Sequence, residues 1–254
     1  MLGKKRRIAV MAEGSFTPLD GKTALGVIRY RSDEVVAVID SVRAGRTCAD
    51  CVGVGGEIPV VASLKGAAAH DADTLLLGIA PQGGTLPESW RRVVAEALLR
   101  GWDVLSGLHV FLADDPELAA LARAKRCAIL DVRRPPASRA IAARRASNLD
   151  TLVVLTVGTD CNVGKMTTAL ELQEELLGRG ARVAFVATGQ TGIFVADQGF
   201  AIDAVPADFV AGVVERMVLD AAREADIVLV EGQGALHHPA YSGVTLSLLH
   251  GACP

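Results

Sequence analysis

Short apolar runs alternate with segments of helical spacing along most of the chain. The runs are rich in Val, Ile and Leu, and they predict strands at residues 8–12, 35–40, 59–62, 74–79, 104–106, 128–132, 152–157, 183–187 and 227–230. Apolar residues at helical spacing predict helices within residues 25–30, 88–100, 115–125, 166–177, 209–223 and 245–250. Regular alternation of strand and helix is typical of an α/β protein with parallel sheets and helices on both faces.

A basic segment divides this alternation into two parts. Residues 133–149 contain Pro135, Pro136 and five arginines, and they show no clear strand. We therefore interpret residues 135–150 as a linker between an N-terminal domain (residues 1–134) and a second domain (residues 151–254). The second domain has three predicted strands, whereas a mean sheet has ~5–6. We expect this domain to be incomplete and the chain to be truncated at its C-terminus.

Composition and charge narrow the possible partners. Half of the 254 residues are hydrophobic and the net charge is −3, with one dense basic run at residues 4–7. Scattered charge gives no surface for nucleic acid. No apolar run reaches the ~18 residues that span a bilayer, and the N-terminus lacks a signal peptide. Five scattered cysteines fit a reducing compartment, so we expect a cytoplasmic protein that contacts no membrane. We also expect a homo-oligomer that acts on a small molecule.

The candidate chemistry begins with a glycine-rich segment between a predicted strand and a predicted helix. The candidate cofactor-binding residues are Gly158, Thr159, Asp160, Cys161, Asn162, Val163, Gly164, Lys165, Met166, Thr167 and Thr168. This is the context of a P-loop, in which glycines let main-chain N–H groups converge on phosphate oxygens. The helix N-terminus and Lys165 add positive charge. The segment predicts binding of a nucleotide or of a CoA-like phosphate ester.

Two departures from the common P-loop pattern bear on metal binding. Five residues separate Gly158 from Gly164, where four are usual, and Met166 stands where Ser or Thr usually ligates magnesium. A thioether is a poor ligand for Mg²⁺, so Thr167 is the alternative hydroxyl ligand. Phosphate binding is therefore better supported than metal-assisted hydrolysis.

Further polar residues follow the other strands of the second domain. Glu231 follows the strand at 227–230, where an acid in P-loop proteins holds the metal ion with Thr167 or faces the phosphates. Gln190 and Thr191 follow the strand at 183–187, and we interpret them as a loop that lines a substrate pocket. Glu231 or His237 is the candidate general acid or base. The simpler alternatives are a turn acid, an ordinary loop and a surface histidine.

The motifs also resemble known families. Residues 158–165 resemble the long P-loop of dethiobiotin synthetase and the cobyrinate amidase group, and residues 230–234 are similar to their Glu-Gly-Ala-Gly segment. A wider set resembles the DUF1611 family, now associated with D-glutamate N-acetyltransferase. The matching segments are residues 78–81, 106–109, 131–136, 158–168, 185–192, 207–212 and 230–245.

This resemblance implies a Rossmann-like N-terminal domain and a P-loop C-terminal domain. It implies acetyl transfer from acetyl-CoA to the amino group of D-glutamate, and it makes Met166 part of the family pattern. It also implies that family members continue past Pro254. Two alternatives stay open. One is an Mg-ATP-dependent carboxylate-activating ligase of the dethiobiotin synthetase type, in which Thr167 and Glu231 hold Mg²⁺, and the other is a nucleotide sensor without turnover.

Overall fold

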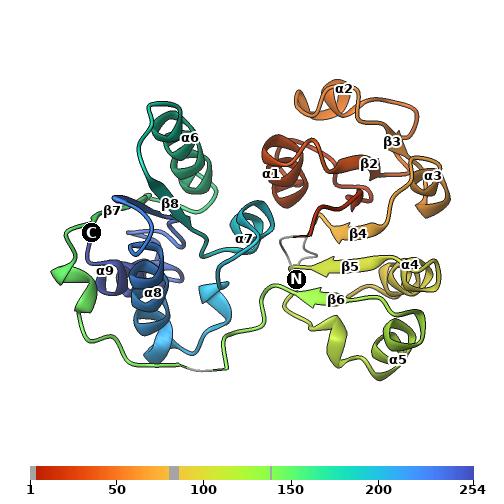
Figure 1. Cartoon of the computed structure of the whole chain (residues 1–254). Helices are drawn as coiled ribbons and strands as arrows, with labels where there is room; N and C mark the ends of the chain where they lie inside the picture. Colours follow the sequence, from red (N-terminus) through yellow and green to blue (C-terminus); the bar gives the residue numbers. More distant parts are fainter. Residues whose placement is uncertain (1–3, 80–85, 138) are drawn as a thin grey trace. The chain divides into compact units, whose positions relative to one another are not determined.

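The chain forms two compact α/β units, residues 1–133 and 134–254 (Figure 1). The computed structural model describes residues 4–79, 86–137 and 139–254, so Ala80 and Pro81 of the motif at 78–81 lie outside the described residues. Within these ranges, no helix combines the length and the apolar character needed to cross a bilayer. Both sheets are parallel, which confirms the predicted fold class.

The first unit is built on a six-stranded parallel sheet. Its strands have the spatial order β3-β2-β1-β4-β5-β6, which is the Rossmann order. β2 and β3 are added on one side of β1, and β4, β5 and β6 are added on the other side. The strands are β1 (Ile8–Met11), β2 (Val35–Ile39), β3 (Val60–Val61), β4 (Thr74–Leu77), β5 (Asp103–Ser106) and β6 (Ile129–Asp131). β1 and β4 are buried at every position, as expected for strands that are covered on both faces.

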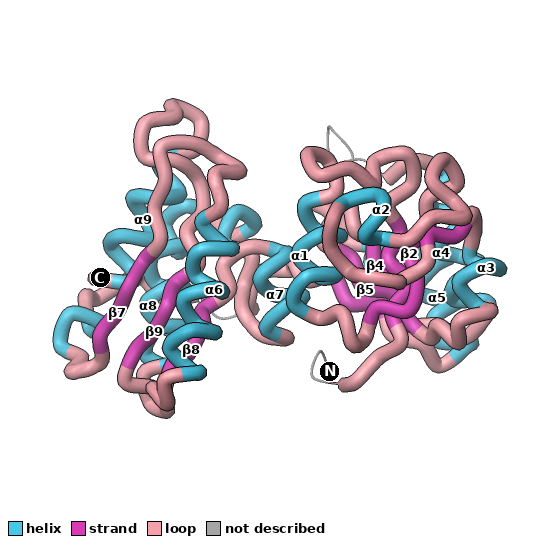
Figure 2. Tube along the Cα trace, turned by 90° about the horizontal axis from the view of Figure 1, so that it is seen from above, coloured by secondary structure: helices cyan, strands magenta, loops and turns pink. Residues whose placement is uncertain are grey.

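Helices flank this sheet (Figure 2). They are α1 (Lys22–Tyr30), α2 (Cys48–Val52), α3 (Leu64–Ala68), α4 (Glu88–Leu99) and α5 (Pro116–Lys125), with a 3-10 turn at Leu112–Asp114. α5 begins where the sequence predicts, because the Asp115 carboxylate accepts hydrogen bonds from the N–H groups of Glu117 and Leu118. α2 and α3 were not predicted, since five residues are too few to show a helical period.

The second unit has a three-stranded parallel sheet in the order β7-β9-β8. Its elements are β7 (Leu152–Leu155), α6 (Lys165–Gly178), β8 (Val183–Val186), α7 (Gln190–Ala196), α8 (Ala207–Ala221), β9 (Ile227–Val230) and α9 (Ser242–Ala252), with 3-10 turns at Arg145–Asn148 and Ile202–Ala204. Leu155 and Val186 both lie level with Val230 in the sheet. The three strands therefore end at one edge, where the following loops carry the predicted site.

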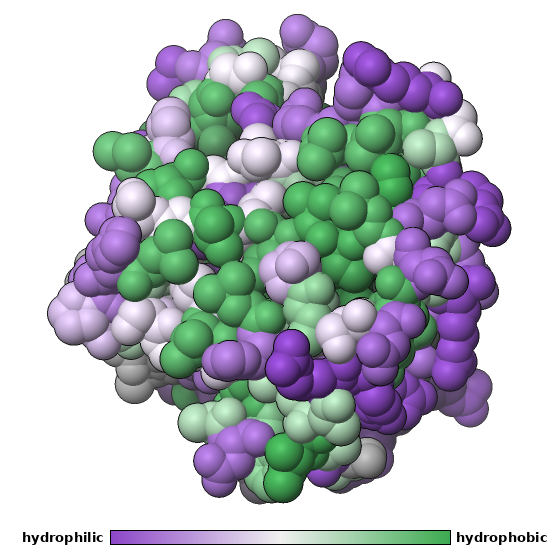
Figure 3. All heavy atoms as spheres, turned by 90° about the vertical axis from the view of Figure 1, so that its left-hand side faces the viewer, coloured by the Kyte–Doolittle hydropathy of each residue, from purple (hydrophilic) through white to green (hydrophobic). Residues whose placement is uncertain are grey.

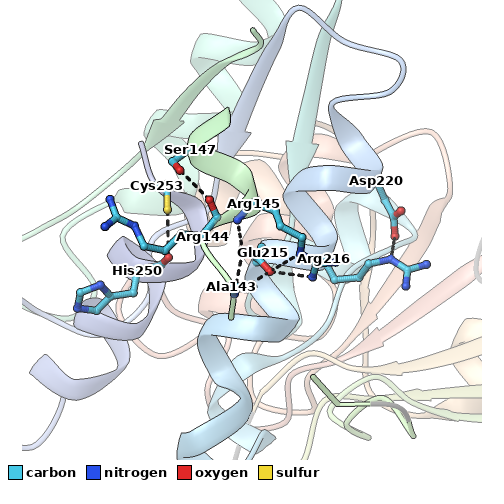
Figure 4. A network of polar contacts seen from close by, with 9 residues as sticks. All are labelled: Ala143, Arg144, Arg145, Ser147, Glu215, Arg216, Asp220, His250 and Cys253. Carbon is cyan, nitrogen blue, oxygen red and sulfur yellow. Dashed lines mark hydrogen bonds and ion pairs between the residues drawn. The ribbon is translucent and has the colours of Figure 1, made fainter. Parts of the chain in front are cut away.

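The segment that we predicted as a linker packs onto the second unit instead. Glu215 on α8 is fully buried, and its carboxylate accepts hydrogen bonds from the main-chain N–H groups of Ala143 (3.2 Å) and Arg145 (2.6 Å). The Arg145 guanidinium donates two more, at 2.8 and 3.0 Å (Figure 4). Burial alone raises the pKa of Glu215, but the hydrogen bonds from Arg145 and Ala143 outweigh it and hold the pKa below its usual value.

One face of the second unit is broadly apolar. Figure 3 views the side on which β7 and α9 lie, and apolar side chains cover much of it. Leu152 on β7 is 59% exposed and Leu246 on α9 is 55% exposed. Within the described residues, β7 pairs with β9 on one side and with no strand on the other. β7 is therefore an edge strand with an apolar surface beside it.

Candidate functional site

The predicted P-loop forms a tight, exposed turn between β7 and α6. Residues 159–164 are all exposed, and two of them have left-handed backbone angles: Asn162 with φ of 58° and Gly164 with φ of 98°. A residue other than glycine is strained at the second of these angles, whereas Asn tolerates the first. The main chain therefore curls back on itself before α6 begins, as a phosphate-binding loop requires.

Positive charge is concentrated where this loop meets α6. Lys165 is the first residue of α6, and the N-cap residue Gly164 has no side chain to satisfy the N–H groups of the first turn. The Lys165 amine donates a hydrogen bond to the carbonyl oxygen of Asp160 at 2.8 Å, so the side chain reaches across the loop. The space that a Cβ atom on Gly164 would face is open. These residues fit an anionic phosphate group.

The residues after Lys165 divide between core and surface. Met166 is only 8% exposed, whereas Thr167 is half-buried and Thr168 is exposed. Met166 therefore acts as a core residue of α6, which accounts for an apolar residue at a position that usually carries a hydroxyl. The role of Thr167 as a magnesium ligand stays a prediction.

The loop after β9 is attached to the P-loop. The N–H group of Leu236 donates to the carbonyl oxygen of Gly158 at 2.8 Å, and the hydroxyl of Thr245 on α9 donates to the carbonyl oxygen of Gln233 at 2.8 Å. The rings of His238 and Tyr241 stack with their centres 4.6 Å apart. His237 is exposed on this loop. The structure thus brings His237 and the P-loop into one neighbourhood.

Glu231 is directed at the start of α7. The side chain is 2% exposed, and one carboxylate oxygen, Oε2, accepts hydrogen bonds from the N–H groups of Thr188 (2.9 Å) and Gly189 (3.0 Å). The other oxygen, Oε1, accepts a hydrogen bond from the side-chain amide of Gln233 at 3.1 Å. These contacts connect the carboxylate to the loops after β8 and β9, and its predicted role toward phosphates or a metal ion stays a prediction.

The segment of Gln190 and Thr191 begins a helix, where the sequence analysis expected a loop. Gln190 is the first residue of α7 and is half-buried, and Thr191 is only 5% exposed. Two glycines, Gly189 and Gly192, favour a loop locally. The difference arises because the N–H groups just before α7 donate hydrogen bonds to the carboxylate of Glu231. This acceptor is distant in sequence, so the local pattern around Gln190 does not reveal it.

Three polar residues that the sequence analysis did not select take part in this arrangement. Thr156 follows β7 and its hydroxyl accepts a hydrogen bond from the N–H group of Gly232 at 2.9 Å. The hydroxyl of Thr188, the second residue after β8, donates to the carbonyl oxygen of Glu231 at 2.6 Å. Gln233 contacts the Glu231 carboxylate. Each lies just after a strand, so the rule that parallel strands end at one edge could have found them.

Family models match both units of the chain. A Rossmann-like domain of unknown function, DUF1611_N, matches residues 41–135, and a P-loop domain of unknown function, DUF1611_C, matches residues 140–254. A crystal structure of a DUF1611 family protein from Anabaena variabilis is 40% identical, with a TM-score of 0.93 over 98% of this chain and 72% of that chain.

Two curated relatives carry the name D-glutamate N-acetyltransferase. The protein from Tritonibacter scottomollicae is 40% identical over 240 residues, which are 93% of this chain and 67% of the relative. The protein from Pseudoalteromonas sp is 42% identical over 192 residues, which are 76% of this chain and 57% of the relative. The two domain models and the solved structure agree with the two-unit fold, and the chain belongs to the DUF1611 family.

Proposed function

We propose that the chain is part of an acetyl-CoA-dependent N-acetyltransferase that acts on D-glutamate. The observation that supports phosphate-ester binding is the curled loop at 158–164, which ends at the uncapped first turn of α6 with Lys165 across it. The printed names of two relatives support the acceptor. The chain spans 67% and 57% of their lengths, so the activity is proposed for the whole protein.

The residues of the loop have distinct roles in this proposal. The N–H groups of the first turn of α6 and the Lys165 amine bind phosphate oxygens of the coenzyme, which supplies an acetyl thioester. The ammonium group of D-glutamate loses a proton before its nitrogen attacks the acetyl carbon. His237 is the proton acceptor that we propose, because it is exposed on the loop bonded to Gly158. The amide C–N bond forms, the thioester C–S bond breaks, and the thiolate takes up a proton.

Titration calorimetry with acetyl-CoA and with Mg-ATP tests this proposal. We expect acetyl-CoA to bind with one site per chain, and D-glutamate, added afterwards, to release free CoA thiol. ADP release that depends on a carboxylate substrate would instead indicate the ligase of the dethiobiotin synthetase type, with Thr167 and Glu231 as magnesium ligands. ATP binding without turnover would indicate a sensor. L-Glutamate serves as the control acceptor, and equal thiol release with both enantiomers would contradict the proposed specificity.

Thiol labelling gives an independent test of the binding loop. Cys161 is exposed within the P-loop, whereas Cys48 is buried, and burial together with the nearby Cys51 raises the pKa of the Cys48 thiol to about 12. At pH 8 we therefore expect maleimide to label Cys161 and to leave Cys48 unlabelled. Saturating acetyl-CoA should slow the labelling of Cys161, as measured by peptide mass spectrometry. Labelling of Cys161 at an unchanged rate would contradict coenzyme binding at this loop.

We further propose a cytoplasmic homo-oligomer, in keeping with the sequence analysis. All five cysteines are free thiols, as in proteins of reducing compartments. Light scattering coupled to size-exclusion chromatography measures the oligomeric state, and a monomer at micromolar concentration would contradict this proposal.

A further inference from the structure

We propose that Glu231 is a positioning residue, which fixes the start of α7 beside the P-loop, and that it is not the group that accepts the proton of the acceptor amine. In its catalytic part this inference rests on the proposed function, because it concerns which residue carries the proton. In its structural part it rests only on the contacts of Glu231 with the segments after β8 and β9.

The first argument is the set of contacts that the carboxylate makes. Oε2 accepts two main-chain N–H groups, from Thr188 and Gly189, and Oε1 accepts the amide N–H of Gln233. A proton placed on Oε2 would create an O–H group that faces two N–H donors, and at least one buried hydrogen bond would be lost. Proton transfer to Oε2, the oxygen that faces the start of α7, would therefore break a hydrogen bond there in every catalytic cycle, and Oε1 can take a proton only if the Gln233 amide turns its oxygen toward it.

The second argument is that the start of α7 lies too close to the Glu231 carboxylate and to Gln233 to hold side chains at two glycine positions. A Cβ atom on Gly192, in the first turn of α7, would lie 2.2 Å from Oε2 of Glu231. A Cβ atom on Gly189 would lie 2.2 Å from the amide nitrogen of Gln233. Both positions therefore accept only glycine without a shift of the Glu231 network. The close approach is typical of a fixed structural contact, in which the carboxylate also offsets the positive end of the helix.

The third argument is that the main chain at Glu231 and Gly232 is fixed on both sides, to Thr188 after β8 and to Thr156 after β7. The carbonyl oxygen of Glu231 accepts the hydroxyl of Thr188, and the next residue, Gly232, donates its N–H to the hydroxyl of Thr156. A Cβ atom on Gly232 would lie 3.0 Å from Cδ of Lys165. The main chain at Gly232 thus lies close to the Lys165 side chain, while the Glu231 side chain accepts hydrogen bonds from the start of α7. Gln190 and Thr191, the predicted substrate residues, are thereby placed relative to Lys165.

Two substitutions separate a positioning role from a proton-accepting role. In Glu231→Gln the amide oxygen takes the place of Oε2 and accepts both N–H groups, and the Gln233 amide turns to offer its oxygen to the new NH₂ group. Glu231→Ala leaves both N–H groups without their acceptor. We expect amide hydrogen exchange at residues 188–196 to be about 10- to 100-fold faster in Glu231→Ala and close to wild type in Glu231→Gln. Gln233→Ala, which keeps both Oε2 bonds, should give a smaller effect.

The activity measurements test the catalytic part. We expect Glu231→Ala to lower kcat/KM for D-glutamate by about 100-fold and Glu231→Gln to restore most of it, with an unchanged pH profile. A Glu231→Gln variant with normal exchange but a 100-fold lower kcat would overturn the inference, because only proton transfer would then be lost. Wild-type exchange rates in Glu231→Ala would overturn it as well. Should the wild-type protein transfer no acetyl group, the proposed function fails, while the exchange rates still decide the positioning role.

Discussion

Replacing Lys165 with alanine is expected to weaken acetyl-CoA binding by about 100-fold, because a charge-assisted hydrogen bond to phosphate is lost at an exposed helix N-terminus. The main-chain N–H groups of the loop would remain, so the loss reports on the ammonium group. Calorimetry on the wild type and on Lys165→Ala at equal ionic strength measures the difference. Thermal unfolding should change little, since the Lys165 amine has its hydrogen bond to Asp160 on an exposed loop.

The chain offers a matched control for this substitution. Lys22 also follows a glycine and is the first residue of a helix, α1, but it lies in the Rossmann-like unit and is exposed. Lys22→Ala should leave acetyl-CoA affinity at the wild-type value. Equal affinities for the wild type and Lys165→Ala would show that the P-loop does not hold the coenzyme.

The second large effect is expected at Glu215, far in sequence from the loops of the site. Glu215→Ala removes the acceptor for two main-chain N–H groups and for the Arg145 guanidinium, and it should lower the free energy of unfolding of the second unit by about 3 kcal/mol. Urea unfolding, followed by a probe in residues 134–254, measures this change. Glu174→Ala, at an exposed position on α6, is the control and should shift the midpoint little.

The pH dependence of stability provides a second readout for Glu215. Its pKa is lower in the folded protein than in the unfolded chain, so its contribution is fully present above the unfolded value of about 4.3. The contribution is lost as the pH falls through the folded pKa. Glu215→Gln should be destabilised near neutral pH and should lose less stability than the wild type on acidification. Parallel pH profiles for the two proteins would contradict this assignment.

The strands could be predicted from the sequence because each is a short apolar run, and the central strands of the first sheet, β1 and β4, are buried on both faces. Residues 227–230 were predicted with the bounds of β9, and residues 35–40 with those of β2 to within one residue. The P-loop could be predicted because its function depends on consecutive residues between a strand and a helix. Met166 is the instructive case, since it stands where a P-loop usually has a hydroxyl, and the structure shows it buried as a core residue of α6.

What could not be predicted depends on contacts between residues distant in sequence. The arginines of residues 135–150 indicated a linker, but one of them, Arg145, bonds to Glu215, which is buried on α8. Gln190 and Thr191 were predicted to lie in a loop, but they begin α7, and the Glu231 carboxylate, which follows β9, accepts a hydrogen bond from the N-cap residue of that helix. In both cases a carboxylate determines the structure of a segment more than 40 residues away in sequence. The pattern of apolar and polar residues within one segment carries no information about such a distant partner.

The order of the three strands in the P-loop unit has a consequence for how this unit folds. β7 and β8 are consecutive strands along the chain, yet they do not pair with each other. β9 lies between them in the sheet and pairs with both. Among the described residues, neither strand has a sheet partner until residues 227–230 arrive. During synthesis β7 therefore stays without its sheet partner for roughly 70 further residues, and such late pairing slows folding. Chaperone dependence of the nascent chain should consequently be greatest before β9 leaves the ribosome.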